Sequence, residues 1–220
     1  MDMGVPKEKI EIIPNGIDLS KYRNLPPKGS FKKKFCINDD EKIVLYLGRI
    51  HESKGLDLLA KAFSVVAKEL EKVRLVMVGS DDGYRKTLLS LITNLGIREK
   101  CLLTGFVEER DKFAALVDND VFVTPSFYGF PITFLEACVT GAPIITTTLG
   151  ETLEWIDGNV GHVTLPTQTN LARAIHRIIS DDELREKFSR NCRKIVKSKF
   201  SLEKVVDRLE QVYREVTDLL

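Results

Sequence analysis

Five short apolar runs constrain the fold of this chain more than any other feature of its sequence. They cover residues 43–47, 74–78, 101–104, 121–124 and 144–147, and a new run begins about every 20 to 30 residues. Such runs are too short for core helices, and their lack of polar alternation is typical of strands buried on both faces. Segments with helical periodicity separate them, which predicts βαβ units in a parallel sheet with right-handed crossovers.

The last third of the chain extends this layout. Residues 160–165 predict one more strand, and after Thr169 the pattern is helical throughout. The expected helices cover 171–179, 181–196 and 201–219, the last with Ser201 as its N-cap. The sequence therefore predicts an α/β fold: a Rossmann-like parallel sheet of about six strands flanked by helices, with further helices at the C-terminal end.

Residues 1–30 differ in character from the rest. Residues 10–13 predict a short strand followed by a Pro-Asn-Gly turn, whereas residues 20–34 are polar, proline-rich and basic. The chain does not start like a natural N-terminus, so we expect an excised domain. Residues 1–30 are interpreted as an interdomain connection and lead-in, and residues 31–220 as one ligand-binding domain.

Charge and hydropathy exclude several classes of protein. The 220 residues carry a formal charge of +1, so no bulk field favours nucleic acid or an acidic membrane surface as a partner. No apolar run approaches the length of a membrane span, and the N-terminus lacks the apolar region of a signal peptide. We therefore expect a cytoplasmic protein whose anion sites, if any, are built locally.

The distribution of cysteine and histidine argues against disulfides and metal sites. The four cysteines form no CxxC pair, and three lie in apolar contexts that predict buried, reduced thiols. The three histidines are scattered, so no metal site is expected. The sequence also contains no GxxxxGK[ST], HExxH or GxSxG motif.

Two cations follow the first predicted strand. Gly48 ends this strand, Arg49 comes next, and Lys54 begins the following helical segment. Both cations are thereby expected at the carboxyl edge of the sheet, beside a positive helix end. Arginine offers a planar fork to phosphate oxygens and lysine a point charge, so we favour a diphosphate clamp over ordinary loop residues.

A second candidate is the Gly129-Phe130-Pro131-Ile132 turn ahead of the helix that carries Glu136. Proline suits the first helical position, and the remaining free amides can hold phosphate. A carboxylate one or two turns into this helix can accept two ribose hydroxyls, as in dinucleotide-binding folds. From spacing alone, a glutamate that merely favours the helix dipole is an equally good interpretation.

Three further loops follow strands at the same edge. The acidic loop after Gly79 does not match GxGxxG and is interpreted as a strand-to-helix connection that lines the cleft. Gly105-Phe106-Val107 can bind a nucleobase through its backbone, with Phe106 below, although a plain β–α loop fits the spacing as well. Gly150-Glu151 and Glu154 place carboxylates where they can bind sugar hydroxyls or support an oxocarbenium-like transition state, and Glu154 can equally cap a short helix.

Several motifs in a fixed order resemble one family over nearly the whole chain. They are IPNGID at 13–18, LGRIHESKG at 47–55, LVMVG at 75–79, LTGFV at 103–107, VFVTPS at 121–126, FLEACVTGAPII at 134–145 and SDDELREKFSRN at 180–191. The chain resembles the C-terminal, donor nucleotide-sugar-binding domain of a retaining family 4 glycosyltransferase of the GT-B fold.

The resemblance implies a role for each candidate residue. Arg49 and Lys54 hold the donor diphosphate and stabilise the leaving nucleotide in a metal-independent reaction, without a cofactor. Glu136 matches the second motif glutamate and binds the ribose, while Gly105, Phe106 and Val107 hold the base. The remaining donor-site positions are Gly48, Gly79, Tyr128, Gly129, Phe130, Pro131 and Ile132.

The implied activity is transfer of a hexose, as a mannosyltransferase or glucosyltransferase, from a UDP, GDP or ADP sugar to a glycan, lipid or small-molecule acceptor. This activity needs an N-terminal acceptor domain that these residues do not contain, so the isolated domain is expected to bind donor without efficient transfer. Peripheral membrane association through that missing domain is a further expectation. A non-catalytic nucleotide-sugar-binding module and a sugar-nucleotide epimerase of GT-B architecture are the alternatives.

The chain departs from the family pattern within the donor site itself. Tyr128 stands where the family has its first glutamate, which contacts the donor sugar. Pro131 replaces a glycine of the turn and removes one amide, and Glu151 replaces the second glycine after the fifth strand. We therefore hypothesise that Glu151 takes over part of the role of the missing carboxylate in catalysis.

Overall fold

A parallel sheet of six strands, in the order β3-β2-β1-β4-β5-β6, forms the centre of the molecule. The computed structural model describes residues 4, 6, 9–149 and 154–217. The strands are β1 Lys42–Leu47, β2 Val73–Val78, β3 Cys101–Gly105, β4 Val121–Thr124, β5 Ile144–Thr147 and β6 Gly161–Thr164. All five pairings between neighbouring strands are parallel, so the predicted α/β fold with about six strands is confirmed.

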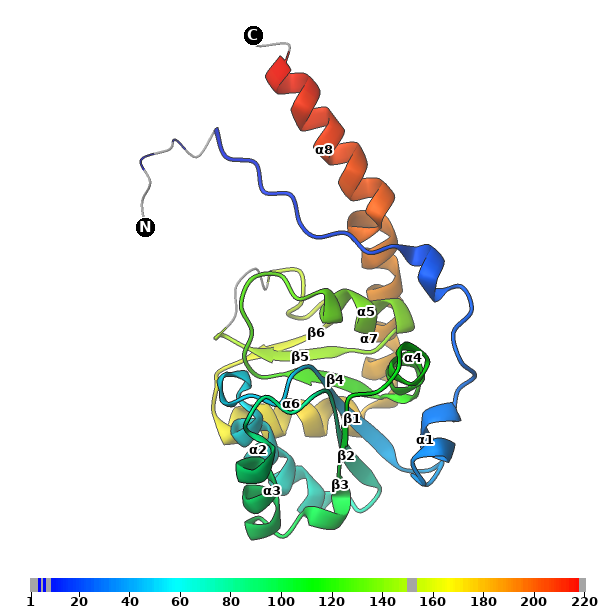
Figure 1. The fold of residues 1–220 in the computed structure, drawn as a ribbon, viewed down its shortest axis with the longest axis vertical. Helices are drawn as coiled ribbons and strands as arrows, with labels where there is room; N and C mark the ends of the chain where they lie inside the picture. The colour runs from blue at the N-terminus through cyan, green and yellow to red at the C-terminus, as the bar shows by residue number, and fades with distance from the viewer. Residues whose placement is uncertain (1–3, 5, 7–8, 150–153, 218–220) are drawn as a thin grey trace.

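Helices cover both faces of this sheet (Figure 1). They are α1 Ser30–Lys34, α2 Leu56–Glu69, α3 Arg85–Asn94, α4 Glu109–Asp118, α5 Ile132–Thr140, α6 Gln168–Ser180, α7 Asp182–Ile195 and α8 Leu202–Thr217. Short turns η2 Leu19–Tyr22, η3 Glu52–Lys54 and η4 Arg98–Lys100 are 3₁₀, and the π-helical turn η5 Val196–Phe200 links α7 to α8. The last three helices, α6, α7 and α8, begin and end within three residues of the bounds predicted for them.

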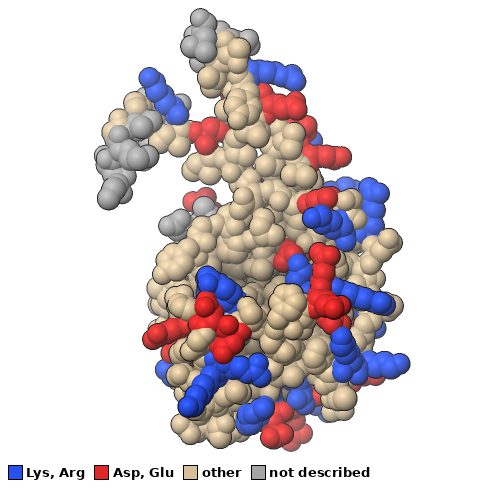
Figure 2. Space-filling model, viewed as in Figure 1, with Lys and Arg blue, Asp and Glu red and all other residues tan. Residues whose placement is uncertain are grey.

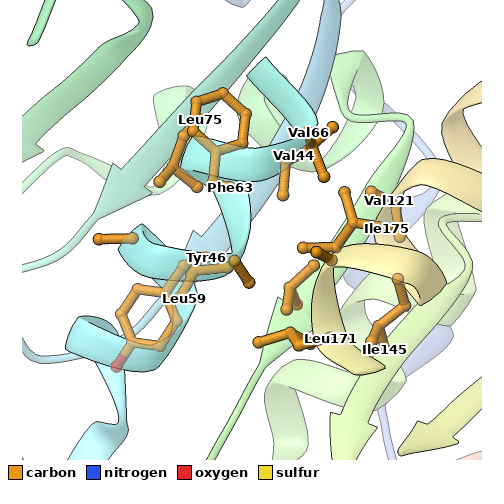
Figure 3. Packing of buried hydrophobic residues seen from close by; sticks show 14 of the residues in the cluster. Val44, Tyr46, Leu59, Phe63, Val66, Leu75, Val121, Ile145, Leu171 and Ile175 are labelled. Carbon is orange, nitrogen blue, oxygen red and sulfur yellow. The ribbon is translucent and has the colours of Figure 1, made fainter. Parts of the chain in front are cut away.

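The alternation of side chains along the strands divides the core into two layers. Val44 and Tyr46 of β1 face the layer that contains α2, α3 and α6, and Figure 3 shows them beside Phe63 of α2. Ile43 and Leu45 face the opposite layer, which contains residues of α1, α4, α5 and α7. Because successive side chains point to opposite faces, a strand buried on both sides is mostly apolar along its length, as residues 43–47 of β1 are throughout.

The ends of the first three strands approach one another very closely. The amide of Gly48 donates to the carbonyl of Val78 at 2.9 Å, and the amide of Gly79 donates to the carbonyl of Gly105 at 3.0 Å. A Cβ added at Gly79 would lie only 1.9 Å from the carbonyl oxygen of Gly48. Glycine after a strand is therefore required here by close backbone contact, and it brings three loops to one edge of the sheet.

The lead-in is attached to the domain by backbone hydrogen bonds. The prediction of a strand over residues 10–13 is wrong, because this segment pairs with no strand among the described residues, and Ile12 is 78% exposed. Ile17, in contrast, is buried and forms an isolated parallel bridge with Ser201. Its amide donates to Phe200 and its carbonyl accepts from Leu202, so the lead-in lies against the start of α8.

Helix α8 projects away from the body of the molecule (Figure 1). It buries none of its side chains, although Val206, Leu209 and Tyr213 belong to its apolar side. Ser201 is its N-cap, since its hydroxyl accepts from the amide of Lys204. The predicted amphipathic helix is present, and most of its apolar face is exposed, whereas Val205 lies close to Gly16 of the lead-in.

The surface carries charges of both signs, and the thiols are distributed as the sequence predicts, with three of the four buried. Figure 2 shows acidic and basic side chains intermingled on the face viewed. Cys101, Cys138 and Cys192 are buried, Cys36 is exposed, and burial raises the pKa of the Cys101 thiol to about 12. No cluster of three or more potential metal ligands occurs within the described part of the chain, and none of its described helices is long and apolar enough to cross a membrane.

Candidate functional site

Arg49 lies at the carboxyl end of β1 and is held from two sides. The hydroxyl of Tyr46 donates to its backbone carbonyl at 2.9 Å. Its guanidinium lies 2.7 Å from the carboxylate of Asp82, which belongs to the loop after β2. Both side chains of this pair are substantially exposed, so the pair is weak and can open when a stronger anion arrives. Asp82 is a partner that the sequence did not reveal.

Lys54 brings a second cation to the same edge. Gly55 follows it in a left-handed conformation, and a Cβ added there would lie 3.1 Å from the Cβ of Pro125. The loops after β1 and β4 therefore touch. The ammonium of Lys54 lies 5.9 Å from the ring centroid of Tyr128, and it has no anionic partner among residues 9–149 and 154–217. This cation is thus available to a ligand.

The turn before α5 is fastened to the rest of the domain. Phe130 stacks on Trp155 with ring centroids 5.9 Å apart, and its carbonyl accepts from the side-chain amide of Asn15 at 3.1 Å. Pro131 is the N-cap and not the first helical residue, and the helix begins at Ile132. The amides of Ile132 and Thr133 find no acceptor in the described structure, so they remain free to bind an anion.

Glu136 is nearly buried and already carries partners. Its Oε1 accepts from the ammonium of Lys112 at 2.7 Å and from the hydroxyl of Tyr22 at 3.1 Å. Burial, together with the charge of Glu136, raises the pKa of Tyr22. Glu136 lies in the second turn of α5, beyond the reach of the helix dipole, so the interpretation of a dipole-favoured glutamate does not explain it. It links α4, α5 and the lead-in.

Removal of the lysine partner tests this link. We expect Lys112→Met to lower the free energy of unfolding by about 1–3 kcal/mol, because it leaves a nearly buried carboxylate without its cation, although partial exposure of Lys112 moderates the loss. Urea unfolding of the chain measures the change. Lys194→Met, at an exposed position of α7, is the control and should change stability by less than about 0.5 kcal/mol. Equal stabilities of the two variants would contradict the structural role.

The other predicted loops lie at the same edge. Gly79 begins a loop in which Asp81 accepts from the amides of Tyr84 and Arg85 and so caps α3. The ring of Phe106 is 81% exposed, and Val107 is the residue that packs against the core. The ring of Phe106 is thus open to solvent, and its place below a bound nucleobase stays a prediction.

Two predicted site residues, Gly150 and Glu151, lie outside the described residues. Glu154 is exposed in a turn, and no helix begins beside it in the part of the chain that the structure describes. The structure thus brings together the loops after β1, β2, β3 and β4, with the cations Arg49 and Lys54 among them. The sequence did not predict that Tyr22 and Lys112 contact Glu136. Both residues lie in segments whose composition is typical of a protein surface.

Comparison with known families accounts for this arrangement. Residues 27–195 match the model of a family described as Glycosyl transferases group 1. The chain belongs to this family. This match confirms the resemblance inferred from the motifs.

Curated glycosyltransferases of this group cover the chain almost completely. An uncharacterized glycosyltransferase of Methanocaldococcus jannaschii is 30% identical over 221 residues, which are 98% of this chain and 56% of that protein. The alpha-D-kanosaminyltransferase of Streptomyces kanamyceticus is 31% identical over 181 residues, or 81% of this chain and 47% of that enzyme. The chain spans about half the length of the curated relatives it matches.

Solved structures agree on the fold. Sucrose-phosphate synthase from Thermosynechococcus elongatus superimposes with a TM-score of 0.79 at 25% identity and covers 96% of this chain and 53% of its own. HepE from Anabaena, solved in complex with UDP, gives a TM-score of 0.84 at 22% identity and covers 96% of this chain and 59% of its own. The second likeness is one of fold alone, and both place this group 1 glycosyltransferase chain in the GT-B architecture.

Proposed function

We propose that this chain binds a nucleotide-diphosphate sugar as the donor domain of a retaining hexosyltransferase. The observation that carries the proposal is the pair of cations at the carboxyl edge of the sheet, where Lys54 has no anionic partner among the described residues and Arg49 has only an exposed, weak one. Open α/β sheets bind ligands at this edge. The HepE structures in complex with UDP and with UDP-glucose, which share the fold, support the choice of ligand class.

In this proposal, each loop at the carboxyl edge of the sheet binds a different part of the donor. Arg49 and Lys54 neutralise the diphosphate and the charge that develops on the leaving nucleotide, so the reaction needs no metal. The free amides at the start of α5 bind phosphate oxygens. The backbone of residues 105–107 holds the base, which can be that of UDP, GDP or ADP. Glu136 accepts ribose hydroxyls through Oε2, since its recorded hydrogen bonds both fall on Oε1. Glu151 assists at the sugar.

The division of labour within the whole protein is part of the proposal. Residues 31–220 form the donor domain, residues 1–30 connect it to an acceptor-binding domain in the complete protein, and that domain supplies any peripheral membrane contact. The reaction takes place in the cytoplasm, and the transferred sugar is mannose, glucose or another hexose. The chain on its own then binds donor without transferring sugar efficiently.

Isothermal titration of the chain with UDP, GDP and ADP tests the proposal. One of the three is expected to bind with a dissociation constant that increases strongly with salt, because charged contacts to phosphate are screened. If none of the three binds, the donor-site assignment fails.

Tyr128 favours one rival, a non-catalytic module that binds nucleotide sugar, because it places an aromatic ring where the family has a carboxylate. The complete protein separates the two functions. Sugar transfer by the complete protein contradicts the module, and donor binding without transfer supports it. Conversion of the donor into an isomer, in the absence of acceptor, would identify an epimerase instead.

A further inference from the structure

An open pocket of about 280 Å³ lies between β6 and α6, away from the cations of β1. Its wall includes His162 and Thr164 of β6, and Asn170, Arg173 and Arg177 of α6. In the sheet order, β6 is the edge strand, with β4 and β5 between it and β1. The pocket is therefore separate from the proposed donor site, and none of the sequence motifs points to it.

Three side chains of α6 that line this pocket are hydrogen-bond donors without a partner among the described residues. Asn170, Arg173 and Arg177 follow one another at helical spacing, so they share one face of the helix. No carboxylate or other acceptor pairs with these three side chains in the described structure. Two arginines one turn apart repel each other, and neither forms an ion pair with a carboxylate among the described residues. An anion between them would relieve this repulsion.

His162 contributes a second unsatisfied group to the pocket wall. Its ring packs edge-on against Phe188 with centroids 5.4 Å apart, and its Nε2 is buried without a hydrogen-bond partner among the described residues. Burial lowers the pKa of His162, and the charge of Arg177 lowers it further, while Asp157 acts in the opposite direction. Asp157 lies 3.9 Å from Nδ1 and is mostly exposed, and it forms no ion pair with either arginine in the described structure.

We propose that this pocket is a second anion site, which binds the phosphate group of a small phosphate monoester. Arg173 and Arg177 approach the group from α6 with forked guanidinium donors, which suit phosphate oxygens, and Asn170 adds an amide donor. A dianionic phosphate also removes the repulsion between the arginines. The pocket volume suits a phosphate with a small sugar attached better than a whole dinucleotide.

Titration of the ¹⁵N-labelled chain followed by NMR tests the site directly. We expect inorganic phosphate and glucose 6-phosphate to shift the backbone amide signals of residues 162–177. Phosphate bound at the donor loops shifts signals of residues 48–55 instead, so failure of this site and failure of the donor site give different maps. A larger response to glucose 6-phosphate indicates a monoester, and an equal response indicates that the phosphate group alone is recognised.

Two variants make the assignment specific. Arg177→Gln is expected to weaken binding roughly tenfold, the effect of one lost charge-assisted hydrogen bond. Arg190→Gln also removes an exposed charge, in this case from α7, where Glu186 is nearby, and should leave the affinity unchanged within about twofold. Equal losses in both variants, or no shift of residues 162–177, would overturn the proposal.

Thermal unfolding distinguishes an arginine that binds phosphate from one that only supports the fold. Without phosphate, Arg177→Gln should raise the melting temperature by about one degree, because it relieves the repulsion from Arg173. Phosphate should raise the melting temperature of the unaltered chain and not that of the variant. A lower melting temperature of the variant without phosphate would mean that Arg177 supports the fold, and would count against the site.

Discussion

Replacement of Gly79 with alanine is expected to destabilise the chain by about 3–5 kcal/mol and to lower its melting temperature by roughly 10 °C. The added Cβ would lie 1.9 Å from the carbonyl oxygen of Gly48, which no rotamer change can relieve. The residue also has a φ of +150°, which side-chain-bearing residues rarely adopt. The strands β1 and β2 must therefore separate at the edge where Arg49 begins.

Gly83→Ala, in the same loop, is the matched control. It too has a positive φ, of +84°, but nothing lies within 4 Å of an added Cβ, so only the backbone cost of about 1–2 kcal/mol is expected. Circular dichroism during heating measures both variants. Equal melting temperatures of the two would show that close backbone contact is not what requires glycine at position 79.

The second large effect concerns the proposed ligand. Lys54→Gln should weaken binding of the preferred nucleoside diphosphate roughly 10- to 100-fold, since a charge-assisted hydrogen bond to phosphate contributes about 1.5–3 kcal/mol. The fold should be unaffected, because the ammonium makes no hydrogen bond to any described residue and contacts only the ring of Tyr128. Titration calorimetry with the diphosphate and with the nucleoside monophosphate measures the loss.

Lys68→Gln is the control, because it removes an exposed lysine from the end of α2 in the same region of sequence. Its affinity should equal that of the unaltered chain within about twofold. The salt dependence should also be shallower in Lys54→Gln than in either of the others, because one cation fewer faces the phosphates. An unchanged affinity of Lys54→Gln would remove Lys54 from the donor site.

The layout of this fold was predictable because its determinants are local. A strand buried on both faces is mostly apolar along its length, and β1 and β2 show this with five apolar residues out of six each. The glycines after them mark the close approach of strand ends. The segment over residues 10–13 shows the limit of such patterns, because an apolar run forms a strand only where a partner strand exists.

The candidate site was predictable in position but not in its internal contacts. Arg49 and Lys54 follow from their place after a strand. The pairing of Glu136 with Lys112 and Tyr22 joins residues up to 114 positions apart, and no spacing rule reveals such contacts. Local sequence patterns do not reveal the ion pair of Arg49 with Asp82 either, because it forms only where β1 and β2 are neighbours in the sheet.

Helix α8 has a consequence for how the molecule unfolds. Because none of its side chains is buried, tertiary packing adds little to its stability, and an isolated helix of its 16 residues is marginal in water. We therefore expect its backbone amides to exchange with solvent through local opening, without unfolding of the sheet. The helix would then lie outside the cooperative unit built on the sheet, and any partner that covered the apolar face of α8 would bring the helix into that unit.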